Sequence, residues 1–169
     1  THASPTLAEA PSAVDLSTDE RAWLDSNSGR LTLLFNTDFP PIEFSTETGD
    51  FTGIGADVIA MVEKTLEVTF TKIPSNDWNR HLQALESGEC AIASTIIDTD
   101  ERESYAFFTT PYAVAPVVII TTQAFEGSLT IEDMKGLRVA VVSGYATEKH
   151  LANRAQGRFD VFPLANVRE

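Results

Sequence analysis

The chain has 169 residues, 43% of them hydrophobic and 22% charged, a composition typical of a folded globular protein. Its 25 acidic residues outnumber the 12 basic ones, and without a Lys/Arg run to follow a phosphate backbone, nucleic acid is not expected as a partner. No apolar run approaches the ~18 to 20 residues that a membrane-spanning helix needs.

The N-terminal segment, residues 1–16, is rich in Ala, Pro, Ser and Thr, which predicts a leader or linker. Ser17 is followed three residues later by Glu20, the pattern of a capping box. A short helix that carries Trp23 and Leu24 is therefore expected from this point.

From Leu31 onward, apolar runs of strand and helix type alternate, which predicts an α/β lobe with a mostly parallel, covered sheet. The lone cysteine, Cys90, lies in one of these apolar runs and is expected in the core. Asn76 is expected to cap a helix at 77–87 and Gly88 to end it. In chain order the expected elements are a strand at 31–36, a helix at 55–66, and then a strand at 68–72, a helix at 77–87 and a strand at 90–95.

The apolar segment Tyr112–Thr121, in which Pro116 leads a run of Val and Ile, is interpreted as a strand that crosses to a second lobe. That lobe should contain a short helix at 130–134, a strand at 137–142, a helix at 145–154 and a strand at 160–163, and Asn166 should cap a further helix. The expected organisation is a leader at 1–16, lobe one at 17–112, the crossing at 113–121 and an incomplete lobe two at 122–169.

One stretch of lobe one carries a specific family pattern. A Thr-x-x-Arg turn at Thr99 and Arg102 is followed by Phe107–Tyr112, which reads Phe-Phe-Thr-Thr-Pro-Tyr. This combination resembles the bacterial periplasmic solute-binding proteins of family 3, which bind polar amino acids, and the related sensor domains of membrane-bound histidine kinases. Asn36–Phe44 and Val139–Gly144 match two further segments of that family.

The resemblance extends from about Leu31 to Glu169 and implies a type II periplasmic-binding-protein fold. In this α/β fold, also called a Venus flytrap, two lobes close on a ligand in the cleft between them. The implied location is periplasmic or otherwise extracytoplasmic.

The matched residues suit a carboxylate ligand on physical grounds as well. Arg102 offers a planar fork of donors that can hold a carboxylate through two hydrogen bonds, or else it is a surface arginine paired with a neighbouring acid. Ser94 and Thr95 end a parallel strand, where α/β sheets bind ligands, and their hydroxyl and backbone groups can complete the carboxylate cradle or merely cap a turn.

Phe39 and Trp78 match family positions that line the cleft, with core packing as the alternative. Asp38 is expected either to accept a donor from the ligand or to form an Asx turn before the following prolines. In lobe two a helix N-terminus favours an anion, and the expected ligand-binding residues there are Ser143, Gly144, Tyr145, Ala146 and Thr147.

The sequence departs from the family at several positions. Ile97 stands where amino-acid binders have a threonine, Cys90 where they have an aspartate, and Tyr145 where they have a small residue, while Val142 offers no polar side chain. The acidic residue that binds the ammonium group in the family would lie beyond Glu169. An altered or non-amino-acid ligand therefore stays open.

The expected function is the binding of an amino acid or related carboxylate by the input domain of a transmembrane receptor. The alternatives are a soluble solute-binding component that docks to the permease of an ABC transporter, and a dehydratase-like enzyme on the same fold. Because His2, His81 and His150 are scattered, neither a metal site nor a catalytic triad is expected, and no cofactor. Asp38 and Glu43 are conceivable acids, but their spacing does not distinguish them from solvated carboxylates.

Overall fold

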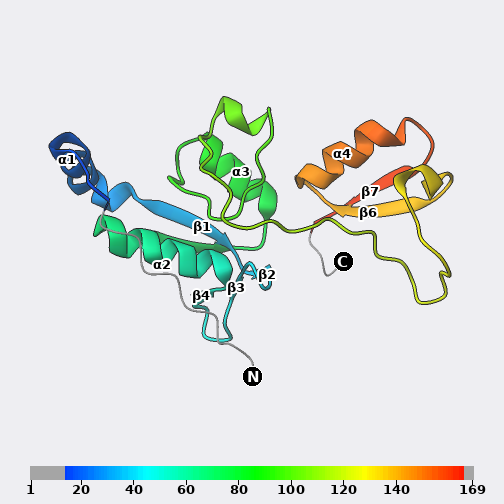
Figure 1. The fold of residues 1–169 in the computed structure, drawn as a ribbon, viewed down its shortest axis with the longest axis horizontal. Coiled ribbons are helices and arrows are strands. Elements are labelled where there is room, and N and C mark those ends of the chain that lie inside the picture. The colour runs from blue at the N-terminus through cyan, green and yellow to red at the C-terminus, as the bar shows by residue number, and fades with distance from the viewer. Residues whose placement is uncertain (1–13, 166–169) are drawn as a thin grey trace, which may run out of the picture.

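A computed structural model describes residues 14–165, which form two α/β bodies joined by an extended segment (Figure 1). Residues 17–112 are called lobe one below, and residues 122–165 lobe two. Most of the expected leader and the helix expected after Asn166 lie outside the described residues. No helix within 14–165 is long and apolar enough to cross a bilayer.

Helix α1 (Thr18–Asn27) begins at the predicted capping box and leads into the 3₁₀ turn η1 (Ser28–Arg30). The Ser17 hydroxyl accepts the Glu20 N–H at 3.3 Å, and the Glu20 carboxylate accepts the Ser17 N–H at 2.8 Å. The Arg21 guanidinium donates to the Leu66 carbonyl at 2.8 Å, so α1 is tied to the end of a second helix.

Strand β1 (Thr32–Asn36) forms the centre of lobe one and is buried on both faces. Because side chains alternate along a strand, Leu33 packs with Ile59 of helix α2 (Ile54–Leu66), whereas Leu34 packs against the opposite layer. There Leu34 meets Ala84 of helix α3 (Trp78–Glu86) and Cys90, which is buried as predicted.

The second parallel strand is β5 (Thr71–Ser75), whose residue Thr71 lies opposite Thr32 of β1. The prediction of a strand starting at Val68 was wrong by three residues, because the exit from α2 uses residues 67–70. Glu67 is left-handed with φ 54°, and the Val68 N–H donates to the Glu63 carbonyl at 3.0 Å.

The strand expected at 90–95 is reduced to one parallel bridge between Leu33 and Ile92. The N–H groups of Ala91 and Ile92 both donate to the Thr32 carbonyl, so no regular ladder develops. The cap of α3 was predicted one residue early: Asp77, not Asn76, accepts the N–H of the first turn.

A small antiparallel sheet follows β1 and was not predicted. It consists of β2 (Asp38–Phe39), β3 (Glu43–Ser45) and β4 (Phe51–Thr52). Gly53 connects it to α2 with φ +107°, and a Cβ there would lie 2.6 Å from the Ile42 carbonyl oxygen. Only glycine fits this junction.

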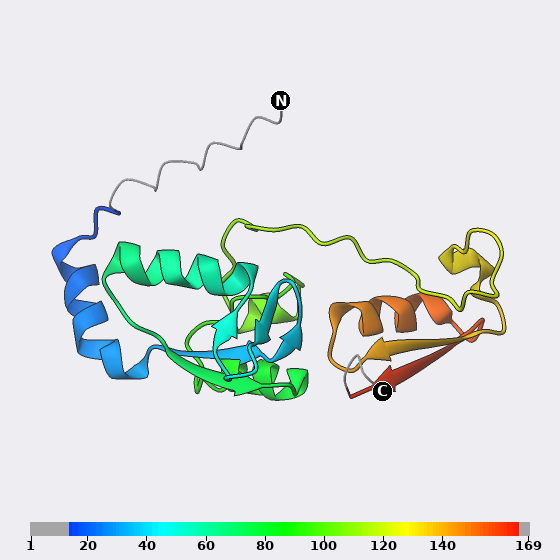
Figure 2. The same ribbon diagram turned by 90° about the horizontal axis from the view of Figure 1, so that it is seen from below.

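The segment expected to cross between the lobes does run between them (Figure 1), but its prediction as a strand was wrong. Tyr112–Thr121 is extended but pairs with no strand among residues 14–165, and its apolar side chains are exposed, Val114 by 92% and Ile120 by 88%. Figures 1 and 2 show this stretch running alone from one body to the other.

Lobe two is a βαβ unit preceded by the short 3₁₀ helix η3 (Ile131–Met134). Strands β6 (Arg138–Val142) and β7 (Asp160–Leu164) pair in parallel, and helix α4 (Ala146–Ala155) connects them. These elements confirm the predictions for this region to within about one residue, and their core consists of Met134, Ala155 and Phe159.

Candidate ligand-binding site

Arg102 lies at the start of the 3₁₀ turn η2 (Arg102–Ser104), which the Thr-x-x-Arg sequence forms. The Arg102 N–H donates to the Thr99 carbonyl at 2.8 Å, and the residue is only 6% exposed. The alternative of a surface arginine paired with a neighbouring acid is therefore wrong. Glu101 pairs instead with Lys149 of lobe two at 2.6 Å.

The guanidinium of Arg102 is held by backbone carbonyls. It donates to Ile97 at 2.8 Å within lobe one and to Gly144 at 3.0 Å across to lobe two. None of the ion pairs within residues 14–165 includes it. Burial lowers the pKa of Arg102 from its usual value, while a side-chain hydrogen bond with Tyr105 and the nearby Glu101 carboxylate act in the opposite direction. The site thus holds a desolvated cation with neutral acceptors.

Trp78, the first residue of α3, meets the same carbonyl. Its indole N–H donates to the Gly144 oxygen at 3.0 Å, and the Arg102 guanidinium carbon lies 5.7 Å from the ring centroid. One carbonyl of lobe two therefore receives donors from two side chains of lobe one.

Gly144 and Tyr145 form the turn between β6 and α4, called the corner below. Gly144 has φ +77°, and a Cβ would lie 2.4 Å from Asn79 Oδ1 and 3.1 Å from Trp78 Cδ1, so only glycine allows this approach. The Tyr145 ring stands edge-on at 5.6 Å from Trp78 and 6.4 Å from Phe39. Burial raises the pKa of Tyr145.

The helix N-terminus expected to bind an anion already carries one from its own helix. The carboxylate of Glu148 accepts the Gly144 N–H at 2.7 Å. Ser143 lies beside Asn79 of lobe one, with 3.5 Å between its Oγ and the amide nitrogen. Ala146 and Thr147 begin α4, and no hydrogen bond or ring contact described for residues 14–165 joins them to lobe one.

Ser94 and the buried acid Glu43 form a pair. The Ser94 hydroxyl donates to Glu43 at 2.5 Å, and the Tyr112 hydroxyl donates to the Ser94 carbonyl at 2.6 Å. The Ser94 hydroxyl can therefore serve a ligand only as an acceptor. Glu43 is 1% exposed, so it is not the solvated carboxylate that the sequence allowed.

The remaining expected residues of lobe one lie nearby. Asn36 forms an Asx turn, since its Oδ1 accepts the Asp38 N–H at 2.9 Å. Asp38 itself is half-buried in β2. Thr95 is half-buried, with its methyl group against Gly55 of α2.

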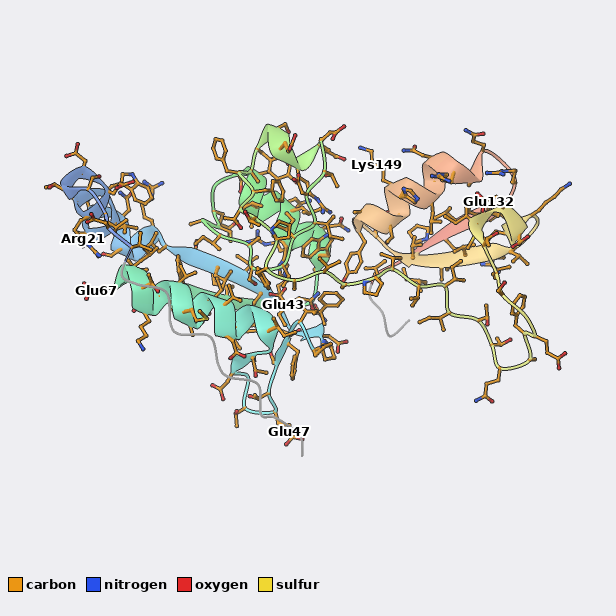
Figure 3. The ribbon with its side chains drawn as sticks, in the orientation of Figure 1. Arg21, Glu43, Glu47, Glu67, Glu132 and Lys149 are labelled. Atoms are coloured by element: carbon orange, nitrogen blue, oxygen red, sulfur yellow. The ribbon has the colours of Figure 1, made fainter. Side chains whose placement is uncertain are left out.

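Sequence reasoning did not single out Asn36 or Asn79, and it did not predict that Glu43 is buried. The available signal for Glu43 was its place in the family-like segment Asn36–Phe44, directly after a buried strand. In Figure 3 Glu43 lies where the strands of lobe one end, on the side toward lobe two. No three His, Cys, Asp or Glu side chains within 14–165 are arranged to hold a metal ion.

Beside the corner, an open hollow of about 450 Å³ lies between the lobes. Both lobes contribute polar and small apolar side chains to it. They are Asn76, Asp77 and Asn79 of lobe one and Ser143, Pro163, Leu164 and Ala165 of lobe two.

Comparison with known proteins gives a consistent result. Residues 31–159 match the family model described as bacterial extracellular solute-binding proteins, family 3. The chain is 28% identical over 121 residues to the L-cystine-binding protein TcyJ of Escherichia coli (strain K12), covering 70% of this chain and 45% of that protein. It is 26% identical over 135 residues to the virulence sensor protein BvgS of Bordetella pertussis, and this match covers 80% of this chain and 11% of BvgS. The chain thus spans about half the length of TcyJ.

Solved structures agree with these relatives. An ancestral arginine-binding protein bound to arginine superposes with a TM-score of 0.72 at 29% identity, covering 82% of this chain and 62% of that one. The B. pertussis BvgS periplasmic domain superposes with a TM-score of 0.77 at 23% identity, covering 91% of this chain and 30% of that one. The ancestral amino acid-binding protein AncCDT-1, a precursor of cyclohexadienyl dehydratase, superposes with a TM-score of 0.73 at 24% identity. This match covers 85% of this chain and 66% of that one. The predicted type II periplasmic-binding-protein fold is confirmed.

Proposed function

Since the chain belongs to the bacterial extracellular solute-binding proteins of family 3, we propose that it binds an amino acid or a related small carboxylate between its lobes, as the extracytoplasmic input domain of a transmembrane receptor. The family itself is extracytoplasmic, and its members bind small amino-acid ligands. The ligand class and the receptor role of this chain are the proposal.

The observation that carries the proposal is the state of Arg102. A buried guanidinium normally pairs with a carboxylate, because unpaired charge is costly away from water. Here, in a chain with a net charge of −13, its hydrogen-bond partners are the Gly144 carbonyl across the lobes and, within lobe one, the Ile97 carbonyl and the Tyr105 side chain, and none of them is a carboxylate. A ligand carboxylate replacing the Gly144 oxygen would gain charge-assisted, two-point hydrogen bonding.

The residues around Arg102 complete the proposed site. Phe39 and Trp78 offer aromatic faces for the apolar part of a ligand, and the Thr95 hydroxyl can donate to its carboxylate. The Ser94 hydroxyl, whose proton is donated to Glu43, offers lone pairs that suit a ligand ammonium group. This division predicts a ligand with both a carboxylate and a hydrogen-bond donor.

Two observations support the sensor role over the transporter role. The BvgS periplasmic domain covers 91% of this chain, against 82% for the ancestral arginine-binding protein. Helix α1 precedes the family-matched residues 31–159 and is tied to the end of α2 by Arg21. As a sensor, the domain would act through a ligand's different affinities for its open and closed states.

The transporter component is the second candidate, favoured by the 28% identity to TcyJ, which is named an L-cystine-binding protein. The full-length sequence discriminates between the two. A sensor must continue into a membrane-spanning segment and a signalling domain, whereas a transporter component docks to a separate permease.

We further propose that the ligand leaves unchanged. Glu43, the buried acid near the site, is held by the Ser94 hydroxyl and the Asn36 N–H, which favours a structural role over proton transfer. AncCDT-1 is a precursor of a dehydratase, so turnover needs a direct test. Mass spectrometry of the ligand after incubation should recover it intact, and a dehydrated product would refute this point.

The proposed function is tested by thermal unfolding of the full-length protein with a panel of amino acids and small carboxylates. A ligand at 100 times its dissociation constant stabilises by about 2.7 kcal/mol, or about 5 to 10 °C for a domain of this size. The amides of the same amino acids, which lack the carboxylate, are the matched controls. Stabilisation by the acids alone supports the proposal, and equal stabilisation by the amides would refute a carboxylate site at Arg102.

A further inference from the structure

The corner of lobe two already occupies the groups that lobe one would present to a ligand. The Gly144 carbonyl oxygen accepts from Arg102 at 3.0 Å and from Trp78 at 3.0 Å. The Tyr145 ring stands against Trp78 and Phe39. The protein's own backbone and side chain thus lie where a bound molecule would have to be.

The match is chemical as well as spatial. A carbonyl oxygen is a hydrogen-bond acceptor like one oxygen of a carboxylate, but it is neutral and accepts at a single atom. The Tyr145 ring provides the apolar surface that a ligand side chain would bring to Phe39 and Trp78. The corner therefore imitates a ligand with weaker electrostatics.

Interactions on both sides hold the corner in this shape. The Glu148 carboxylate accepts the Gly144 N–H at 2.7 Å, and the Gly144 backbone, at φ +77°, fits against Asn79 only because it lacks a Cβ. Tyr145 is the N-cap residue of α4, which fixes the position of its backbone. The Asn36 side chain interacts with its hydroxyl.

We propose that Gly144 and Tyr145 act as a built-in competitor, which holds the lobes together without ligand and makes Tyr145 the residue that limits ligand affinity and size. This inference rests on the proposed function for the identity of the ligand, but the lobe contact is independent of it. Only protein molecules whose corner has withdrawn from lobe one can bind ligand. The apparent dissociation constant is therefore the intrinsic one divided by the fraction of protein in that state.

Tyr145→Ser tests the proposal while preserving α4, because serine is among the best N-cap residues. The substitution removes the ring that contacts Phe39 and Trp78. Tyr145→Phe is the matched control, since it keeps the ring and removes only the hydroxyl. Lys149→Ala is a second control, because it removes an exposed inter-lobe ion pair with Glu101 that is expected to contribute little.

Lobe separation is measured without ligand by electron–electron resonance between spin labels on the full-length protein. The labels replace exposed Glu47 of lobe one and exposed Glu132 of lobe two, both marked in Figure 3, and native Cys90 is buried. Calorimetric titration with the stabilising ligand, or with glycine and acetate where none is found, is run on the same variants. Circular dichroism melting verifies that each variant is folded.

The expected result is a longer and broader label distance in Tyr145→Ser than in the wild type, Tyr145→Phe and Lys149→Ala, with ligand affinity raised about tenfold or more. An unchanged distance in folded Tyr145→Ser would overturn the proposal, as would an unchanged affinity for a ligand that the wild type binds. A longer distance without binding of any carboxylate would support the lobe contact and refute the proposed function instead.

Discussion

The hydroxyl of Ser94 donates a hydrogen bond to the carboxylate of Glu43, a contact that joins the loop beyond the Ile92 bridge to β3 inside lobe one. Glu43 also accepts the N–H of Asn36, the last residue of β1, at 3.0 Å. One buried carboxylate thus connects the three segments of lobe one that end beside the candidate site. We expect it to position them.

Glu43→Ala should therefore be strongly destabilising. It leaves the Asn36 N–H and the Ser94 hydroxyl without their acceptor in the core, a loss of roughly 3 kcal/mol in the free energy of unfolding. Urea denaturation measures it, with Glu47→Ala on the exposed loop after the same strand as the control, expected within about 0.5 kcal/mol of wild type. Equal effects of the two substitutions would contradict the role given to Glu43.

Neighbouring residues Ser94 and Thr95 should respond differently to loss of their hydroxyls. Ser94→Ala removes a donor to Glu43 and should lower the free energy of unfolding by about 1 to 3 kcal/mol. Thr95→Val keeps the methyl group that faces Gly55 and should instead weaken ligand binding with little loss of stability. Unfolding experiments and calorimetric titrations of both variants test this. A loss of stability in Thr95→Val together with a loss of binding in Ser94→Ala would contradict the roles given to the two residues.

His81 should make the stability of lobe one depend on pH. Burial lowers its pKa below the usual 6.5, although the Ser75 carbonyl and the charges of Glu43 and Asp77 act in the opposite direction. Because the unfolded chain binds the proton more readily, this stability is present above about pH 6.5 and lost as the pH falls through the folded pKa. His81→Gln should flatten the decline in stability as the pH falls below about 6.5. An identical slope in urea denaturation would disprove the contribution.

Tyr112 begins the exposed crossing segment, and its hydroxyl donates to the Ser94 carbonyl at 2.6 Å. Tyr112→Phe removes this hydrogen bond and should lower the free energy of unfolding by about 0.5 to 1.5 kcal/mol. Hydrogen exchange should show faster opening of the residues around Ser94 in the same variant. Unchanged exchange would mean that the crossing is anchored elsewhere.

Local sequence signals were sufficient for most elements. The capping box at Ser17 and Glu20 placed α1, and the continuous apolar run after Leu31 predicted a strand buried on both faces. These signals depend on nearest neighbours along the chain, which is why they are readable without a structure. They also sufficed for β6 and β7 in lobe two.

Errors arose where distant contacts decide the outcome. The start of β5 was placed too early because Glu67 adopts a left-handed conformation and extends the helix exit. The expected strand after Cys90 has a single bridge to Leu33, and apolar content alone does not determine how many rungs a ladder has. The composition of the crossing at 113–121 is typical of a strand, but a strand forms only where a partner strand lies beside it, and within residues 14–165 this segment has none.

The candidate site shows the same division. The family-like pattern predicted Arg102 and Trp78 as site residues, but the contact of both side chains with Gly144 depends on how the two lobes meet. Glu43 was noticed in the sequence only as a conceivable acid, because a buried glutamate and a solvated one look alike until their burial is known. Asn36 was missed for the same reason.

The most direct test is calorimetric titration of the stabilising ligand into the wild type and into Arg102→Gln, with thermal unfolding as the check of the fold. Arg102→Gln is expected to stay folded and to bind the ligand at least about 100-fold more weakly, because the charge-assisted hydrogen bonds to the carboxylate are lost. A dissociation constant unchanged by Arg102→Gln would mean that Arg102 does not hold the carboxylate and that the ligand binds elsewhere in the molecule.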